Sequence, residues 1–420
     1  MITVLKNGFL IDGSGAEPVA GSAVVVENDR IAAVGPPEAL SWPQDARVVD
    51  VGGKTIMPGI VDAHAHMIAY EYNLETRITT PGSLTVLKTT KNLRATLEAG
   101  VTTVRDAGGS DLGIKLGVEQ GLVPGPRLLI CIAPLTQTGG LFDIHAASGA
   151  TVDMNTMFGR VRHFCGGVEN LRKITREFLL AGADVIKISS TGSVFRKPPG
   201  TRPAPQYTPE EIRAVVYEAK AAGKRTMTHC EGGPGLRHAV EAGIDSIDHG
   251  FFLTDEDIEL LLKHETYLVP TLAAVHGILK IVDRDPDAAI NPQSVRVARE
   301  LVVHHNESIG KAIEAGVKIA MGSDAFGHDQ GENLFELELM VRAGMTPMQA
   351  IVAATQTASE LLDISADLGT IAPGKIADIL VVDGNPLDDI TILQERHNLV
   401  AIMKAGDFFK NQMSSANGDD

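Results

Sequence analysis

The chain has 420 residues, 44% of them hydrophobic and 21% charged, which is typical of a globular protein with one large domain and a smaller one. Its 37 basic and 53 acidic residues give a net charge of −16, and no block of Lys or Arg stands out. This balance disfavours nucleic acid and anionic membrane surfaces as partners. A small-molecule substrate fits it better.

The N-terminal residues lack the basic start and long apolar segment of a signal peptide, and no stretch approaches the ~18–20 apolar residues of a membrane span. The three cysteines share no C-x-x-C spacing, which is unlike a disulfide framework. We therefore expect a soluble protein of the cytoplasm.

Both ends of the chain predict β-structure. Residues 3–35 contain two runs of alternating polar and apolar residues, and the C-terminal part contains "GTIAPGKIADILVVDGNP" and "VAIMKAG". Such runs are typical of antiparallel strands. We expect residues 1–57 and 366–420 to form one composite, β-sandwich-like domain beside a larger domain of residues 58–365.

A repeated phrase organises the region between these ends. In five places an apolar-periodic helix ends in Ala-Gly and a short apolar run follows; the glycines are Gly100, Gly182, Gly223, Gly243 and Gly316. Glycine just past a helix end adopts the left-handed conformation at no side-chain cost, so each phrase predicts a helix, a C-cap and a strand. Thr208 and Thr346, each followed by proline, have the pattern of helix starts.

Nearly continuous apolar runs alternate with these helices, as in a parallel sheet covered on both faces. They lie near residues 60–66, 101–106, 127–133, 184–189, 225–230, 244–249, 266–272 and 317–323. Eight such units over roughly 310 residues favour a closed (β/α)8 TIM barrel with insertions over an open doubly wound sheet.

In a (β/α)8 barrel the active site lies at the C-terminal ends of the strands. The residues that close the apolar runs are His64, His66, Asp106, Lys187, His229, His249 and Asp324. Side chains at i and i+2 of a strand share a face, so His64 and His66 should lie side by side, where two imidazoles can share one cation. The whole set predicts a metal site. We expect Asp106 to be a hydrogen-bond partner or strand-end cap and not a ligand.

Lys187 is the unusual member of this set, because a cation should be repelled by a metal. Two interpretations remain open. Lys187 could pair with Asp324 in a one-metal or metal-free site. Alternatively, burial could make its amine neutral, so that it reacts with CO2 to give a carbamate, an anion able to bridge two metals.

The ordered set of H-x-H, lysine, two strand-end histidines and a final aspartate resembles the amidohydrolase superfamily, in the binuclear branch with a carboxylated lysine. The resemblance spans nearly the whole chain and is carried by "PGIVDAHAHM", "GVTTVRDAGG", "GADVIKIS", "AGIDSIDHG", "MGSDAFG", "ELELMVRAGMTPMQAI" and "GTIAPGKIADILVVDGNPLDDI". It is closest to the Xaa-Pro dipeptidase-like and imidazolonepropionase-related group. That group includes amidases that cleave aryl-amino-acid amides such as ochratoxin A.

The resemblance implies two divalent metal ions, with zinc as the expected metal. The implied ligands are His64, His66 and Asp324 for one ion, His229 and His249 for the other, and carboxylated Lys187 as the bridge. It also implies a metal-activated hydroxide that attacks the carbonyl, while Asp324 takes the proton of the water and hands it to the leaving amine. The relatives further imply a homo-oligomer.

Two departures from the family pattern concern substrate binding. Leu141 stands where relatives have the histidine of a Gly-Gly-His, with His145 four residues later, and Gln330 stands where they have the histidine of a His-Gly-x-Asn, with His328 two residues earlier. We expect His145 and His328 to be candidate substrate contacts. Arg196, in a proline-rich loop after the lysine strand, is a candidate for binding a substrate carboxylate.

We therefore predict a metal-dependent hydrolase of the C–N bond of N-acyl amino acids, dipeptides or an aryl amide such as ochratoxin A. The same binuclear centre could instead act on an ester, lactone, carbamate or phosphotriester, because hydroxide does not by itself choose the electrophile. A mononuclear cyclic-amidine deaminase is a third interpretation, and it should not need Lys187 as a ligand. A non-catalytic relative would be expected to have lost ligands, and this chain retains all six.

Overall fold

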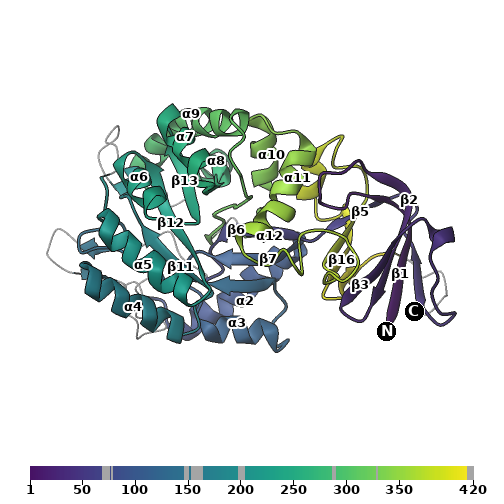
Figure 1. Ribbon diagram of the computed structural model, residues 1–420. Helices are drawn as coiled ribbons and strands as arrows, with labels where there is room; N and C mark the ends of the chain where they lie inside the picture. The colour runs from purple at the N-terminus through teal and green to yellow at the C-terminus, as the bar shows by residue number, and fades with distance from the viewer. Residues whose placement is uncertain are drawn as a thin grey trace.

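The computed structural model describes residues 1–68, 76, 79–145, 151–152, 164–196, 204–285, 290–327 and 330–413. It is a mixed α/β structure. Figure 1 shows a strand-rich end, formed by the first and last strands of the chain, next to a larger part in which helices surround parallel strands. The short elements are β9 Ile144–His145, β10 Thr151–Val152, and the 3-10 turns η1 Pro37–Ala39, η2 Val194–Arg196 and η4 Ile390–Gln394.

An eight-stranded sheet joins the two ends of the chain. Its strands are β1 Ile2–Leu10, β2 Val19–Glu27, β3 Arg30–Gly35, β4 Arg47–Asp50, β5 Thr55–Pro58, β15 Ile379–Val382, β16 Leu399–Lys404 and β17 Asp407–Asn411. They are ordered β17-β16-β15-β5-β1-β2-β3, with β4 also paired to β1. The strands of the two ends meet in the antiparallel pair β5–β15, and Arg30 and Ile376 form a further bridge between the ends.

The strands predicted at both ends are therefore present, but the expected antiparallel pairing is only partly correct. β1 runs parallel to both β4 and β5. The reason is that alternation of polar and apolar residues determines which face of a strand is buried, and it carries no information about the direction of the partner strand.

Two parallel sheets follow the predicted apolar runs. The first contains β6 Ile60–Ala65, β7 Val101–Asp106 and β8 Arg127–Ile130; the second contains β11 Val185–Ser189, β12 Arg225–Gly232, β13 Ser246–Phe252 and β14 Tyr267–Val269. Parallel bridges connect their edges: Leu135 to Ile188, Leu268 to Ile319, and Ala65 to Ala325. The run at 317–323 thus contacts β14 through the bridge of Ile319, and Ala325, just after the run, bridges to β6. The run forms no regular strand of its own.

Helices lie between these strands in the sequence and pack on their outer side (Figure 1). They are α2 Gly82–Glu98, α3 Leu112–Glu119, α4 Val168–Leu180, α5 Pro209–Ala221, α6 Pro234–Glu241, α7 Asp255–His264, α8 Leu272–Arg284, α9 Pro292–Glu314, α10 Phe335–Arg342, α11 Pro347–Ala353 and α12 Gln356–Leu361. The predicted starts are confirmed, because Thr208 and Thr346 each form a capping box. The predicted ends are confirmed too, since all five glycines of the Ala-Gly phrases have positive φ.

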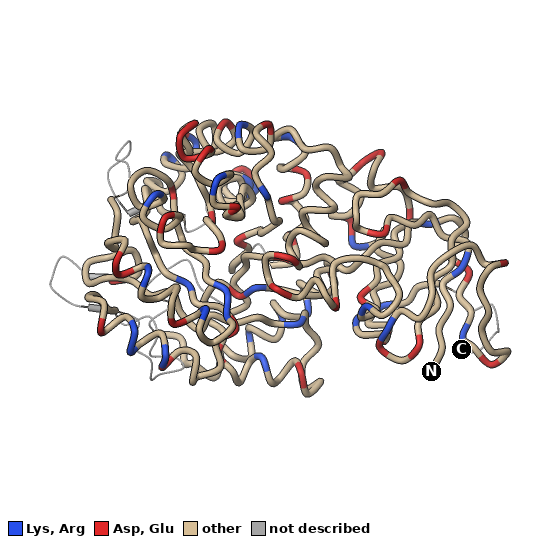
Figure 2. The backbone as a smooth tube through the Cα atoms, in the orientation of Figure 1, with Lys and Arg blue, Asp and Glu red and all other residues tan. Residues whose placement is uncertain are grey.

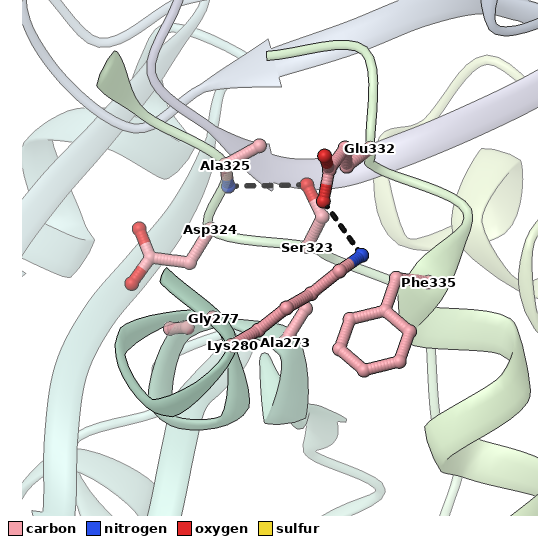
Figure 3. A pocket seen from close by; sticks show the side chains of 9 residues that line it. Ala273, Gly277, Lys280, Ser323, Asp324, Ala325, Glu332 and Phe335 are labelled. Atoms are coloured by element: carbon pink, nitrogen blue, oxygen red, sulfur yellow. Dashed lines mark hydrogen bonds and ion pairs between the residues drawn. The ribbon is translucent and has the colours of Figure 1, made fainter. Parts of the chain in front are cut away.

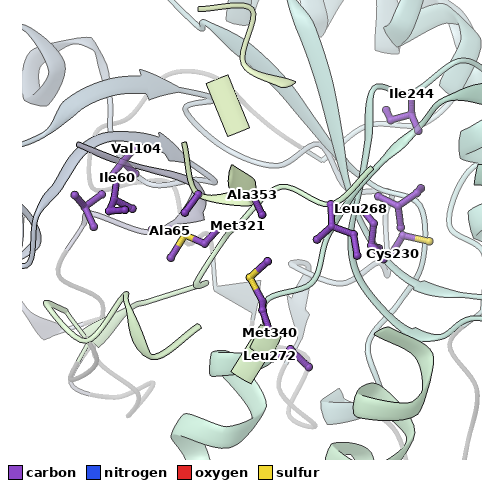
Figure 4. Close-up of a cluster of buried hydrophobic side chains, with 14 of the residues drawn as sticks. Ile60, Ala65, Val104, Cys230, Ile244, Leu268, Leu272, Met321, Met340 and Ala353 are labelled. Atoms are coloured by element: carbon purple, nitrogen blue, oxygen red, sulfur yellow. The ribbon is translucent and has the colours of Figure 1, made fainter. Parts of the chain in front are cut away.

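The main hydrophobic core lies between the parallel strands and the helices. Figure 4 shows part of it, in which Ile60, Val104 and Leu268 from strands and Met321 from the 317–323 run pack with Leu272 and Met340 from helices. The terminal sheet has a separate buried cluster that includes Leu5, Val24 and Ile379.

Charged residues are interspersed along both parts of the chain, without a basic tract, as Figure 2 shows. Within the described ranges, no helix combines the length and apolar character that crossing a membrane requires.

Candidate metal centre

Two histidines and an aspartate meet beside the end of β6. His64 belongs to the strand and His66 follows it. Their Nε2 atoms lie 3.4 and 3.3 Å from Asp324 Oδ1, and the three ligand atoms lie within 4.8 Å of one another. Burial alone would raise the pKa of Asp324, but His64 and His66 hold it well below its ordinary value. Two imidazoles and an ionised carboxylate at this spacing could hold a metal ion.

Asp324 reaches His64 because the segment before it lies directly against β6. The Asp62 carboxylate accepts hydrogen bonds from the backbone N–H groups of His64 (3.0 Å) and Ser323 (3.1 Å), and so ties the two segments together. A Cβ on Gly322 would lie 2.8 Å from His64 Cβ, so this approach requires glycine. Asp324 itself has a φ of 51°, a conformation that non-glycine residues adopt mainly where surrounding contacts enforce it.

Each of the two imidazoles is oriented by an acceptor behind it. His64 Nδ1 donates to Asp248 Oδ2 (2.6 Å), and His66 Nδ1 donates to the Gly108 carbonyl (2.8 Å). Since both partners are acceptors, the ring nitrogens that face them carry hydrogen, which leaves Nε2 as the atom through which each ring would bind a cation.

Asp106 supports this arrangement from the next strand. Its carboxylate accepts hydrogen bonds from Gly108 N (2.9 Å), Met67 N (2.8 Å) and Ser110 Oγ (2.7 Å). These bonds fix the loop whose carbonyl orients His66. The predicted hydrogen-bonding role of Asp106 is confirmed.

Arg105 balances the charge of Asp248 inside the parallel strands. Both side chains are fully buried, and Arg105 Nη2 lies 3.1 Å from Asp248 Oδ2. Burial would raise the pKa of Asp248, but Arg105 and His64 lower it below its ordinary value. Asp248 is therefore an anion, and it fixes the tautomer of His64.

Lys187 lies next to the same group. Its side chain is 1% exposed, its Nζ is 3.3 Å from His64 Nε2, and burial lowers its pKa. In the described part of the chain no carboxylate is within ion-pair distance of Nζ, so an ion pair with Asp324 is not formed. A buried amine with a lowered pKa that contacts a candidate ligand fits the carbamate interpretation.

His229 on β12 and His249 on β13 form a second group. Their ring centroids are 4.5 Å apart, and His249 is 5.1 Å from the His64 ring. His249 Nδ1 is hydrogen-bonded to Thr271 Oγ1 (2.7 Å). Burial, followed by the nearby His229 and His64, lowers the pKa of His249 well below its ordinary value. His249 is therefore neutral, which is the state that binds metal.

The nitrogen His229 Nε2 is buried and has no hydrogen-bond partner among the described residues. A buried polar atom without a partner is unfavourable, and a cation would satisfy it. Imidazoles and a carboxylate also form a donor set that suits divalent zinc and similar ions. The residues present therefore fit a metal centre.

Comparison with known proteins agrees with this chemistry. Residues 55–408 match the profile of the Amidohydrolase family. The chain belongs to this family.

The amidohydrolase is similar to ochratoxinase of Aspergillus niger, with 29% identity over 438 residues, covering 100% of this chain and 89% of that protein. A solved prolidase complexed with N-methylphosphonate-L-proline has 33% identity and a TM-score of 0.89, covering 98% of this chain and 100% of that one. A solved Xaa-Pro dipeptidase with methionine bound in the active site has 30% identity and a TM-score of 0.86, covering the same shares. This amidohydrolase is a hydrolytic enzyme.

A small pocket of the amidohydrolase opens beside Asp324. Figure 3 shows Asp324 and Lys280 lining it together, with Lys280 of α8 extended past the Phe335 ring toward Glu332. Lys280 Nζ is 2.8 Å from Glu332 Oε2 and 4.7 Å from the ring centroid of Phe335. Arg284 Nη1 also contacts Glu332, at 3.6 Å. Lys280 therefore lines the same pocket as Asp324, with its ammonium paired to Glu332.

The predicted substrate contacts of the amidohydrolase remain predictions. His145 ends β9, which pairs with β10, and Arg196 ends the turn η2. His328 lies outside the described residues.

The two replaced histidine positions have structural contacts of their own. Leu141 is buried and lines a cavity of about 270 Å³ with Gln137 and Gln206. Gln330 donates from Nε2 to the His66 carbonyl (2.6 Å) and the Ala325 carbonyl (3.0 Å), so it ties the loop after Asp324 to the β6 ligands.

Sequence reasoning missed several residues around the predicted ligands. Asp248, Thr271 and Glu231 contact ligand histidines directly. Arg105 pairs with Asp248, and Lys280 lines the pocket beside Asp324. A signal existed for Glu231, since it stands two residues after His229 on the same strand and therefore on the same face. None existed for Lys280, which occurs in an ordinary amphipathic helix.

Proposed function

We propose that this amidohydrolase is a binuclear metal-dependent amidase that hydrolyses the C–N bond of N-acyl amino acids, dipeptides or an aryl amide such as ochratoxin A. The observation that carries the proposal is the buried Lys187 amine, 3.3 Å from the Nε2 atom with which His64 faces Asp324. A cation at that place would oppose metal binding, whereas a carbamate would provide the bridge between two ions.

The proposal includes the architecture that holds the site. Residues 58–365 form a closed (β/α)8 barrel, and residues 1–57 and 366–420 form a composite β-domain. The barrel is supported by the parallel bridges that connect the edges of the two parallel sheets, and the second domain by the separate hydrophobic cluster of the terminal sheet.

In this centre one divalent ion, expected to be zinc, would be held by His64, His66 and Asp324, and a second by His229 and His249. The amine of Lys187 would add to CO2, with formation of an N–C bond and loss of one proton, and the resulting carbamate would be a further ligand for both ions. When bound, the ions would lower the pKa of the attacking water and polarise the scissile carbonyl.

Asp324 is the proposed catalytic residue of this chain. Because its pKa lies well below the ordinary value, it is ionised at neutral pH and can accept the proton of the attacking water. It then donates this proton to the nitrogen of the leaving amine as the C–N bond breaks.

The substrate class rests on the relatives and on one charge. An ochratoxinase, a prolidase and an Xaa-Pro dipeptidase are among the similar proteins. The ammonium of Lys280 lines the pocket beside Asp324 and could receive the carboxylate of a substrate. We further propose that the enzyme acts as a homo-oligomer on a small molecule.

The test is the metal content per chain, by elemental analysis of protein purified without chelators, for the parent and for Lys187→Ala. We expect about two ions in the parent and fewer than one in the variant, with hydrolysis of N-acyl amino acids falling in parallel. Lys404→Ala is the matched control, since Lys404 is another lysine whose pKa burial lowers, and it bonds to the Gly125 carbonyl.

One ion in the parent, unaffected by Lys187→Ala, would contradict the binuclear amidase and favour the cyclic-amidine deaminase. Two ions with turnover confined to esters, lactones, carbamates or phosphotriesters would retain the centre and change the substrate class. The panel should therefore pair each amide with its ester.

A further inference from the structure

Glu231 is a buried carboxylate at the end of β12 for which neither the fold nor the proposed chemistry yet provides a role. It follows His229 by two residues, so both side chains leave the strand on the same face. Glu231 is 0% exposed.

The carboxylate of Glu231 is held in place from one side. It accepts hydrogen bonds from the Val194 backbone N–H, at 3.1 Å to Oε2 and 3.3 Å to Oε1. The Glu231 N–H donates to Thr191 Oγ1 at 3.1 Å. Among the described residues no lysine or arginine lies within ion-pair distance. A buried carboxylate without a cation is strongly unfavourable.

The open side of Glu231 faces the nitrogen that lacks a partner. Oε1 lies 3.5 Å from His229 Nε2, and that nitrogen forms no hydrogen bond with any described residue. The distance matches the 3.4 and 3.3 Å that separate the Nε2 atoms of His64 and His66 from Asp324 Oδ1. Two donors that each bind one tetrahedral zinc ion at about 2.1 Å lie roughly 3.4 Å apart.

We propose that Glu231 is a metal ligand, whose Oε1 binds the same ion as His229 and His249. This inference rests on the proposed binuclear centre. Without Glu231 the protein supplies four ligands to the first ion (His64, His66, Asp324 and carboxylated Lys187) and three to the second (His229, His249 and carboxylated Lys187). Glu231 gives the second ion a fourth ligand, and the ion supplies the positive charge that the buried carboxylate lacks.

The test is Glu231→Gln, which keeps the shape of the side chain and an acceptor for the Val194 N–H but removes the charge. Apoenzymes of parent and variant are titrated with Zn²⁺ against a competing chelator, and bound Co²⁺ is followed by its visible absorption. We expect the second ion to bind more than about 100-fold more weakly and the first to be unchanged, because loss of an outer partner of a ligand costs only 10–100-fold.

Asp257→Asn is the matched control. Asp257 is also fully buried and accepts a backbone N–H, from Thr254 at 3.1 Å, but it lies beside no candidate ligand. Both ions should bind to this variant as they do to the parent.

The outcomes separate the two proposals. Two ions in the parent with unchanged affinity in Glu231→Gln, or with a loss within the 10–100-fold range, would overturn Glu231 as a ligand and leave the binuclear amidase intact. One ion in the parent would overturn both. If Glu231→Gln does not fold, Glu231→Asp gives the same test, since its shorter side chain withdraws the carboxylate from the ion and should weaken the second site by a similar factor.

Discussion

The imidazoles around Asp324 are each bonded at Nδ1 to a carboxylate or a backbone carbonyl, whereas in the second group only His249 has an Nδ1 partner among the described residues, and that partner is a hydroxyl. His64 is oriented by the anion Asp248 and His66 by a carbonyl. His249 is bonded to a neutral hydroxyl, and His229 Nε2 has no hydrogen-bond partner among the described residues. The first half of the centre (His64, His66 and Asp324) is therefore held in place by contacts within the protein. The second half (His229 and His249) depends more on a bound metal ion. We expect the first half to bind metal more tightly.

The largest effect on stability should come from removing Arg105, the buried cation that pairs with Asp248 behind His64. Arg105→Met leaves Asp248 as an unpaired buried charge, and we expect a loss of about 3–5 kcal/mol in the free energy of unfolding, measured by urea denaturation. The double variant Arg105→Met with Asp248→Asn removes the unpaired charge and should recover part of this loss. A loss below about 1 kcal/mol in the single variant would mean that Arg105 does not hold the first half together.

A smaller effect is expected from the residues that orient one histidine in each half. Asp248→Asn should lower the affinity for the first ion by about 10–100-fold, because a neutral amide fixes the tautomer of His64 less firmly than a carboxylate. Thr271→Val should lower the affinity for the second ion by no more than about tenfold, since His249 loses only a neutral hydrogen-bond partner. Chelator competition measures both. Equal losses of affinity, or a larger loss from Thr271→Val, would contradict the expectation that the protein orients the first half more firmly than the second.

The first half was also the more predictable from the sequence. The H-x-H spacing places His64 and His66 on one face of a strand without further information. That Asp324 joins them depends on Asp62, which binds both segments, and on the close approach at Gly322. A contact between residues about 260 positions apart is not encoded locally. The expected barrel placed Asp324 at the same strand ends as the histidines, and the resemblance to a known family assigned it to the same ion as His64 and His66.

The residues that support the ligands could not be predicted for a similar reason. Asp248 precedes a predicted ligand and would be expected to face the opposite way, yet it orients His64. Its role depends on the register between parallel strands that are buried on both faces, and nearly continuous apolar runs do not indicate that register. The run at 317–323 was recognised as an apolar segment, but its single bridges and the positive φ of Asp324 interrupt the regular strand that the pattern predicts.

The two halves differ, finally, in the charge that borders them. Lys280 lines the pocket beside Asp324 in the first half, and Glu231 lies beside His229 in the second. A substrate carboxylate should therefore orient toward Lys280.

Lys280→Met should raise KM for an N-acyl amino acid by about five- to tenfold, with kcat changed little, because a partly exposed ion pair contributes about 1 kcal/mol. The amide of the same substrate, which lacks the carboxylate, should not respond. Lys318→Met is the control, since Lys318 also pairs with a glutamate (Glu265, 3.2 Å) and lies near an aromatic ring (Tyr267, 5.7 Å), but does not line the pocket. An equal rise in KM for both substrates would mean that Lys280 shapes the pocket and does not read the charge of the substrate.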